Sequence, residues 1–287
     1  MSAVAMEVVP VRVPERSWRS EVRAARIVWR RDLIRFATDR MRIATMLIQP
    51  LLFLFVLGIG LQTLAAASTD GVDLKTFIYP GVICMALVFG AMFNAISLVM
   101  DREFGFLREM LVAPVRRSSI VVGKCLGGAT VASLQGMILL ALAGLVGVPY
   151  DPVLLLGLFG LMLLIAFTVT AFGVMVASRV KQIQTFTTVM QMLVMPLFFL
   201  SGALYPLAGL PTGLELLTRL NPLTYAVDPM RRLVFDQLDI SAAARHTLDA
   251  GVTWFGWRVP TLVELGIVLA LGLAMMALAI FQFTRTD

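Results

Sequence analysis

The chain has 287 residues, of which 59 % are hydrophobic and 15 % are charged. Soluble domains are usually about 45–50 % apolar and about 25 % charged, so this composition excludes an ordinary soluble protein. A net charge of +6 could suit nucleic acid, but the basic residues flank long apolar segments. That location indicates a membrane protein with no nucleic-acid partner.

Residues 1–42 form a basic N-terminal segment with ten Arg and no sign of a cleavable targeting sequence. Within it, residues 17–42 predict an amphipathic helix, because apolar side chains recur at helical spacing and Arg side chains follow one position later. These are Trp18, Val22, Ala25, Trp29, Leu33 and Phe36, and Arg19, Arg23, Arg26 and Arg30. The pattern is typical of a helix in the membrane interface beside anionic lipids; a cytosolic helix packed on a partner is the alternative, and the two are compatible.

Six apolar stretches follow, each long enough to cross a hydrocarbon core about 30 Å thick as a helix. They predict an all-α polytopic membrane protein whose six-span permease domain covers 43–287, with spans at 43–64, 77–100, 119–147, 153–177, 186–204 and 261–283. Six spans place both termini on one side, which also collects most of the Lys and Arg. The positive-inside rule then predicts a multi-pass protein of the plasma (inner) membrane with both termini in the cytoplasm.

The external segment 205–260 is too long for a structureless loop, so we expect it to contain short helices. Leu214, Leu217 and Leu220 share a helical face, and Pro222 and Pro229 should interrupt the helices around them. Short pieces of this kind can enter the membrane and return where they pack against protein, so we predict re-entrant helices here.

The loop 101–118, in the stretch "DREFGFLREMLVAPVRRSSIVVGK", is charged although it lies between two spans. Spacings of three and four among its apolar residues predict a short helix over 101–113, which Pro114 should end. Ser118 or Ser119 could then cap the third span. The apolar faces of this helix need a cover. Either the chain's own interfacial helix and the membrane surface cover them, or a groove on a cytoplasmic partner does.

Few other residues suggest chemistry. Cys84 and Cys125 have no metal-ligand spacing and are expected to be packing residues, and His246 is expected to be solvated. No charged residue lies near the middle of a predicted span, so a proton relay is not expected. Uncharged polar residues in spans two and five could line a substrate pathway or hydrogen-bond between helices, the commoner fate: Asn94, Ser97, Thr187, Thr188 and Gln191. Abundant Met and Phe favour an amphipathic or lipid-like substrate.

Taken together, these features resemble the permease subunits of type-2 ABC exporters, especially the drug-resistance and antibiotic-export branch. The resemblance covers nearly the whole chain and rests on the basic amphipathic helix, the six spans, the charged loop, "FFLSGALYPLAGLP" (198–211) and "LNPLTYAVDPMRR" (220–232). It implies alternating access by two permease chains, identical or related, above two ATPase subunits. The permease would not be an enzyme, and ATP and Mg²⁺ would bind only to the ATPase. In agreement, the chain has no G-x-x-x-x-G-K-[ST] motif, and Cys125 follows Gly123-Lys124.

The resemblance also implies roles for particular residues. Residues 101–113 would be the coupling helix on the ATPase, beside the connecting helix 17–42, with contacts from Asp101, Arg102, Glu103, Phe104, Phe106, Leu107, Arg108, Met110 and Leu111. An ordinary solvated pair is the alternative for Glu103 and Arg108. The external gate would include Tyr205, Asn221, Pro222 and Tyr225.

Two rival classes remain open. A gradient-driven carrier or channel would work without ATP. A membrane-embedded lipid-modifying enzyme would need converging catalytic groups. The only external material for such a site is a set of residues without ligand spacing, namely Asp228, Asp236, Asp239, Asp249 and His246.

Overall fold

The structure, a computed structural model, describes residues 17–60, 62, 73–105, 116–238, 248, 251–254 and 256–285. The helices are α1 (Trp18–Thr38), α2 (Arg40–Leu52), α3 (Gly58–Gly60), α5 (Leu74–Glu103), α7 (Arg117–Leu140), α8 (Pro152–Ala177), α9 (Ile183–Phe199), α10 (Thr212–Leu220), α11 (Thr224–Asp236) and α13 (Thr261–Arg285). Two further turns are the π-helical η1 (Phe53–Leu57) and the 3₁₀ helix η2 (Ala143–Val146). The strands are β1 (Thr253–Trp254) and β2 (Trp257–Arg258).

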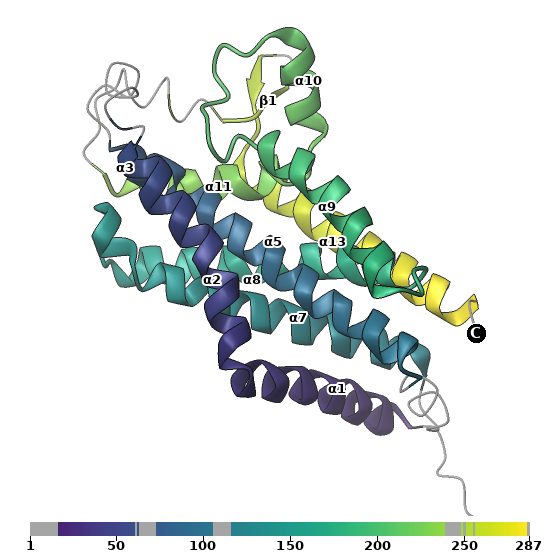
Figure 1. Cartoon of the computed structure of the whole chain (residues 1–287). Helices are drawn as coiled ribbons and strands as arrows, with labels where there is room; N and C mark the ends of the chain where they lie inside the picture. The colour runs from purple at the N-terminus through teal and green to yellow at the C-terminus, as the bar shows by residue number, and fades with distance from the viewer. Residues whose placement is uncertain are drawn as a thin grey trace, which may run out of the picture.

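The centre of the fold is a bundle of four long helices, α5, α7, α8 and α13, which run side by side (Figure 1). Helix α9 packs on one flank of α5, and α2 with η1 and α3 packs on another. Helix α1 lies across the outside of α7, and α10, α11 and the hairpin β1–β2 gather at the opposite end. Helix α5 is the most enclosed element, because α7, α8, α9 and α11 all contact it.

Within the described residues, five helical segments are long and apolar enough to cross a membrane. They are Ile43–Gly60, Leu74–Glu103, Arg117–Leu140, Pro152–Ala177 and Thr261–Arg285. These agree with five of the predicted spans and confirm a multi-pass, mostly helical membrane protein. The predicted span 186–204 corresponds to α9, which has 17 residues and a length of about 26 Å at 1.5 Å per residue. Because α9 is slightly shorter than a typical hydrocarbon core, the count of six spans stays a prediction.

The first span contains an irregularity with a sequence cause. Pro50 lies inside α2 and has no backbone N–H to donate, and the π-helical turn Phe53–Leu57 begins three residues later. Inserted turns of this kind are a usual way for a helix to absorb a break in its hydrogen-bond ladder. The helical path nevertheless continues to Gly60.

The segment 205–260 differs from the sequence prediction in two respects. It contains the expected helices α10 and α11, but also a two-stranded antiparallel hairpin that pairs Thr253 with Arg258 and Trp254 with Trp257. The prediction of an all-α fold is therefore wrong for these residues. Pro229 lies inside α11 and does not interrupt it, whereas Pro222 does fall between α10 and α11. Burial of α11 against α5, α8 and α13 offsets the lost hydrogen bond.

Two glycines of α7 allow α1 to pack closely. A Cβ at Gly123 would lie 2.7 Å from the carbonyl oxygen of Ala25, and one at Gly127 would lie 2.9 Å from a carboxylate oxygen of Asp32. Residues four apart lie on one helix face, and small residues at this spacing let two helix backbones approach. Helix α1 therefore packs on α7 at the G-x-x-x-G pattern of residues 123–127.

A glycine of α5 fixes the end of α9 in the same way. A Cβ at Gly81 would lie 2.5 Å from the carbonyl oxygen of Ala203, in the turn after α9. That turn is also held by Arg231, whose guanidinium donates to the carbonyl of Gly202 at 2.6 Å. The nearest atoms are the carbonyl oxygen, Cβ and Cα of Ala203, and none of these can rotate away from an added Cβ.

We therefore expect Gly81→Ala to destabilise the protein by about 1–3 kcal/mol, the usual cost of overpacking. The measurement is the midpoint of thermal unfolding of purified protein in detergent. Gly160→Ala is the matched control, because a Cβ at Gly160 on α8 meets no atom within 4 Å. Equal midpoints for the two variants would contradict the packing of Gly81 on Ala203.

Candidate functional site

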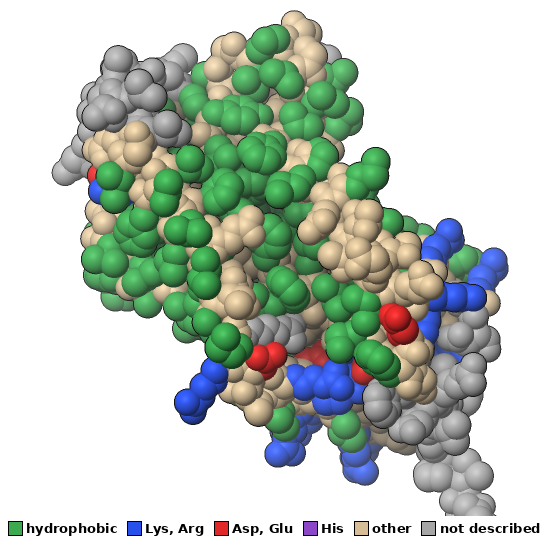
Figure 2. Space-filling view, in the orientation of Figure 1, with side chains coloured by type: hydrophobic (Ala, Val, Ile, Leu, Met, Phe, Trp, Pro, Cys, Tyr) green, Lys and Arg blue, Asp and Glu red, His purple; other side chains and the backbone are tan. Residues whose placement is uncertain are grey.

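Basic side chains gather at one end of the molecule, over α1 and the adjoining end of the bundle, while the rest of the visible face is largely hydrophobic (Figure 2). We call this the basic end; it consists of α1, residues 101–105, 116–119 and 178–183, and the last turn of α13. The opposite end, with α10, α11 and the hairpin, is called the far end. The predicted coupling loop begins and ends at the basic end.

A lysine with no exposed surface lies at the centre of the basic end. The ammonium group of Lys124, on α7, is 2.7 Å from the Ser97 hydroxyl oxygen, 3.2 Å from an Asp32 carboxylate oxygen and 3.6 Å from an Asp101 carboxylate oxygen. Asp32 belongs to α1, and Ser97 and Asp101 belong to α5. An isolated buried charge is very costly, so this cation requires both carboxylates.

Two arginines of α1 complete the cluster. Arg31 donates to Asp101 at 2.7 Å, and the guanidinium of Arg35 lies 3.6 Å from the other oxygen of that carboxylate. Asp101 is 2 % exposed, so the residue that begins the predicted coupling helix is buried and contacts three cations. The cluster of Arg31, Asp32, Arg35, Asp101 and Lys124 is named the ionic junction.

The two residues after Asp101 contact other elements. The guanidinium of Arg102 donates to the carbonyls of Ala177, Ser178 and Val180 at 3.3, 2.9 and 3.0 Å, in the turn between α8 and α9. The carboxylate of Glu103 accepts the backbone N–H of Ile183, the first residue of α9, at 2.8 Å. No side-chain bond from Gln182 caps α9, so Glu103 supplies an anion to a helix N-terminus that lacks its own cap. The last turn of α5 therefore joins α1, α7, the α8–α9 turn and α9.

The other end of the loop is held by α1. The carboxylate of Glu21 accepts the N–H of Arg116 at 3.0 Å and the Ser119 hydroxyl at 2.5 Å. These groups lie at the start of α7, where Arg116 makes no side-chain cap. Glu21 is 8 % exposed. Helix α1 thus contacts both the last turn of α5, through Asp101, and the N-cap and first turn of α7, through Arg116 and Ser119.

The predicted coupling helix over 101–113 requires correction at its start. Residues 101–103 are the last turn of α5, since nothing interrupts the helix before Phe104, and Gly105 then adopts a φ of +82°. Phe104 is 63 % exposed. The remaining coupling residues fall outside the described part of the chain: Phe106, Leu107, Arg108, Met110 and Leu111.

The predicted cap of the third span is also wrong. Helix α7 begins at Arg117 with Arg116 as its N-cap, and Ser119 donates to Glu21. The sequence pattern predicted no role for Lys124, Glu21 or Asp32. The G-x-x-x-G pattern around Lys124 could have indicated a close helix contact at this point of α7. Glu21 and Asp32 lie on the same face of α1 as the apolar residues Ala24, Val28 and Phe36, and this could have indicated that α1 is the partner helix.

The predicted pathway residues fall into two groups. Asn94 and Ser97 are buried within the bundle, and Ser97 accepts a hydrogen bond from Lys124, which corresponds to the alternative of contacts between helices. Thr188 and Gln191 are exposed on α9, and Thr187 is half-buried there. Both threonines donate to the carbonyl four residues earlier. A pathway role for these residues stays a prediction.

The predicted gate residues hold the far end together. Asn221 donates to the carbonyl of Leu197 at 2.5 Å, and so ties the α10–α11 turn to α9. Tyr225 donates to the carbonyl of Arg219 at 2.7 Å and accepts from the Trp254 indole at 2.9 Å. Burial raises the pKa of Tyr225, so its hydroxyl stays protonated and can donate. Tyr205 is half-buried in the turn after α9.

Near these residues, Pro222 lines an apolar cavity of about 110 Å³ between α5, α8, α9, α11 and α13. A second ionic cluster lies at the same end, where Arg232 pairs with Asp228 and with Glu264 at 3.2 Å. Asp228 also accepts the N–H of Val252, which attaches the hairpin segment to α11. Asp239, His246 and Asp249, considered above for catalysis, lie outside the described residues.

A bundle of apolar helices with an ionic junction at one end and a helix across that end defines a polytopic membrane protein. The model of the ABC-2 type transporter family matches residues 23–235. The chain belongs to the ABC-2 type transporter family. Members of this family are transmembrane permeases that normally pair with a separate ABC ATPase subunit.

Individual relatives have different names. The chain is 32 % identical over 191 residues to a putative transport permease, ycf38, of Cyanophora paradoxa, covering 65 % of this chain and 66 % of the relative. It is 29 % identical over 249 residues to nodulation protein J of Rhizobium leguminosarum bv. viciae, covering 84 % and 92 %. It is 27 % identical over 235 residues to the probable doxorubicin resistance ABC transporter permease protein DrrC of Mycobacterium tuberculosis, covering 79 % and 83 %.

The ionic junction gives a prediction about stability. Lys124→Met should cost about 3–5 kcal/mol, because it leaves Asp32 buried beside Asp101 without its main cation. Lys124→Met combined with Asp32→Asn should recover most of that loss, because residues 124 and 32 are then both uncharged and no buried carboxylate at residue 32 needs a cation. Thermal unfolding in detergent measures both variants.

The control is Arg219→Met, which breaks the more exposed pair with Glu215 on α10 and should change stability by at most about 1 kcal/mol. If the double variant is no more stable than Lys124→Met alone, the attraction between Lys124 and Asp32 is not what holds α1 on α7.

Proposed function

We propose that the chain is the membrane-spanning permease of an ATP-driven exporter that moves an amphipathic, drug-like or lipid-like compound out of the cytoplasm or the inner leaflet. The family membership supports this proposal, and so does the likeness to a permease named for doxorubicin resistance. Under the positive-inside rule, the basic end faces the cytoplasm of a cell bounded by the plasma (inner) membrane. Two ATPase subunits then dock at the basic ends of two permease chains.

The observation that carries the proposal is the set of contacts made by Asp101, Arg102 and Glu103. These three consecutive residues join α5 to α1, α7, the α8–α9 turn and α9. A force applied to the segment that follows α5 is therefore delivered to all of these elements together. An ATPase that binds this segment can move several spans with one contact, as an ATP-driven pump requires.

Transport then proceeds by alternating access. ATP binding draws the two ATPase subunits together and favours one conformation of the permease pair over the other, which is a shift between two populations. Helix α9 has a face with Thr188, Gln191 and Met192 that is exposed in the single chain. We expect this face to contact the second permease copy and the substrate. Met and Phe side chains supply the adaptable apolar surface that a family of amphipathic compounds needs.

Glu103→Ala should lower ATP-dependent transport by about tenfold or more while the protein level stays unchanged. The reason is that α9 loses the anion at its N-terminus and its direct bond to the last turn of α5. The measurement is efflux of a fluorescent amphipathic dye from cells, normalised to the amount of permease in the membrane.

The matched control is Glu215→Ala, an acid on α10 at the far end whose partner is Arg219. It removes one carboxylate without affecting the basic end, and efflux should be unchanged. Full efflux with Glu103→Ala would exclude a coupling role for Glu103 and favour an ordinary solvated side chain.

The first test of the whole proposal is to purify the tagged chain gently from native membranes and to identify its partners by mass spectrometry. We expect a protein of similar abundance with a Walker A motif, crosslinked through residues 101–118. Recovery of no such ATPase after crosslinking in intact membranes would contradict the proposal, and uptake in vesicles without ATP would then identify a gradient-driven carrier or channel.

A further inference from the structure

A groove of about 920 Å³ runs along α1 and reaches α7. Its lining has a polar part and a separate apolar part. Three arginines, Arg23, Arg26 and Arg30, contribute the polar part, and the rest of the wall is aliphatic or aromatic. The apolar lining residues are Ile27, Trp29, Leu33, Ile34, Phe36, Ala37 and Leu134.

The arginines of α1 fall into two groups. Arg31 and Arg35, on the side of the ionic junction, both pair with Asp101. Arg23, Arg26 and Arg30 are exposed, and within the described residues none of them makes an ion pair or a side-chain hydrogen bond. The groove therefore gathers three positive charges, and none of its described lining residues is an acid.

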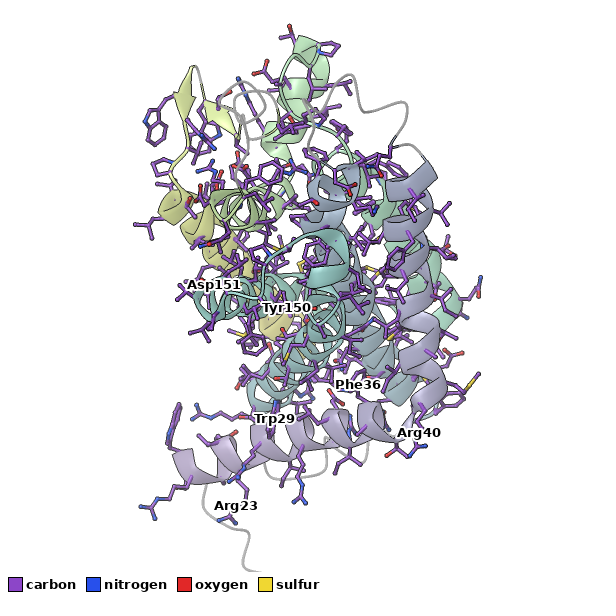
Figure 3. The ribbon with its side chains drawn as sticks, turned by 90° about the vertical axis from the view of Figure 1, so that its left-hand side faces the viewer. Arg23, Trp29, Phe36, Arg40, Tyr150 and Asp151 are labelled. Carbon is purple, nitrogen blue, oxygen red and sulfur yellow. The ribbon has the colours of Figure 1, made fainter. Side chains whose placement is uncertain are left out.

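The apolar part of the groove lies nearer to the helix bundle than the polar part does. Trp29 and Phe36 extend from α1 toward the bundle, and Arg23 extends from the opposite side of the helix (Figure 3). Trp29 is fixed in this position, because its indole donates to the Thr130 hydroxyl of α7 at 3.1 Å. The apolar wall thus adjoins the membrane-spanning helices, and the charges lie farther from them.

The apolar wall continues along α7. Leu134 lines the groove and is 38 % exposed, and Met137 and Ile138, one turn further along α7, are similarly exposed. A molecule in the groove can therefore place an anionic group among the arginines and an apolar chain along the outer face of α7. A phospholipid has both parts in this order.

We propose that the groove is a binding site for an anionic phospholipid, whose phosphate contacts Arg23, Arg26 and Arg30 and whose acyl chain lies against Leu134. The occupant is a lipid and not a soluble phosphate, because most of the lining is apolar and continues onto a membrane-spanning helix. A net anionic lipid is favoured over a zwitterionic one because three cations that no described residue pairs with face the groove. This site requires only that the chain is a membrane protein, and it is independent of the exporter proposal.

The test uses the full chain in nanodiscs of phosphatidylcholine that contain a trace of either of two photoactivatable lipids, phosphatidylglycerol or phosphatidylcholine, each with the reactive group on its acyl chain. We expect the phosphatidylglycerol probe to label the peptide that contains Leu134 and the peptide from Arg23 to Ala37. Replacing Arg23, Arg26 and Arg30 with Gln should reduce this labelling about tenfold or more, because each basic residue near a membrane surface adds to anionic lipid binding.

Two control variants separate a defined site from general surface charge. Arg179, Lys181 and Arg285 also lie at the basic end but do not line the groove, so replacing these three with Gln should leave the labelling unchanged. Leu134→Trp keeps all three arginines and fills the wall of the groove, and it should reduce labelling even if the triple Arg variant proves unstable.

Several results would overturn the proposal. One is equal labelling by the phosphatidylglycerol and phosphatidylcholine probes, and another is equal loss in the two triple variants. Unchanged labelling in Leu134→Trp would mean that charge alone attracts the lipid and that no groove site exists. In an Ile27→Cys variant, a crosslink at that position between two copies of the chain would mean that a protein covers the groove. No ATPase is present in this experiment, so its failure leaves the exporter proposal untouched.

Discussion

The arrangement of the basic end depends on one buried cation. Lys124 has no exposed surface, and a charge in that position is tolerated only with anions in direct contact. Its two carboxylates come from different helices, Asp32 from α1 and Asp101 from α5. The positions of α1, the last turn of α5 and the first turns of α7 are thereby determined together. The close approach that this requires is possible because Gly123 and Gly127 leave room for the backbone of α1.

A second theme is that two helices receive their N-terminal anions from other elements. Helices α7 and α9 begin without a side-chain cap of their own. Glu21 of α1 serves α7, and Glu103 of α5 serves α9. By contrast, α8 is capped locally by Asp151, which lies directly before it. Local caps stabilise single helices, whereas these two long-range contacts tie the relative positions of helices to each other. This is the property expected where motion must pass from one element to the next.

Hydropathy and spacing predicted much of the fold and less of the site. Long apolar runs predicted five of the spans, with ends that differ by up to seven residues in α7, because a membrane helix is specified by local composition. The same applies to α1, because the helical spacing of its Trp and Arg residues is visible within one segment. The role of Lys124 depends on Asp32, which is 92 residues away, and a single sequence does not display such a pair. The hairpin 253–258 was missed because two-residue strands have no detectable period. The end of α5 at Glu103 was missed because the residues that follow it are equally compatible with a helix.

The ionic junction also constrains how the chain is made. Asp32 leaves the ribosome well before Lys124, and at about 5–20 residues per second the interval of 92 residues lasts about 5 to 20 s. During that time α1 carries Glu21 and Asp32 on a face that has no partner yet. The first span can enter the bilayer in this interval, but α1 can reach its final position only after α7, the third span, has been inserted. Final docking of the N-terminal helix is therefore a late event in biogenesis, and a chain that stops before Lys124 lacks the buried cation that pairs with Asp32.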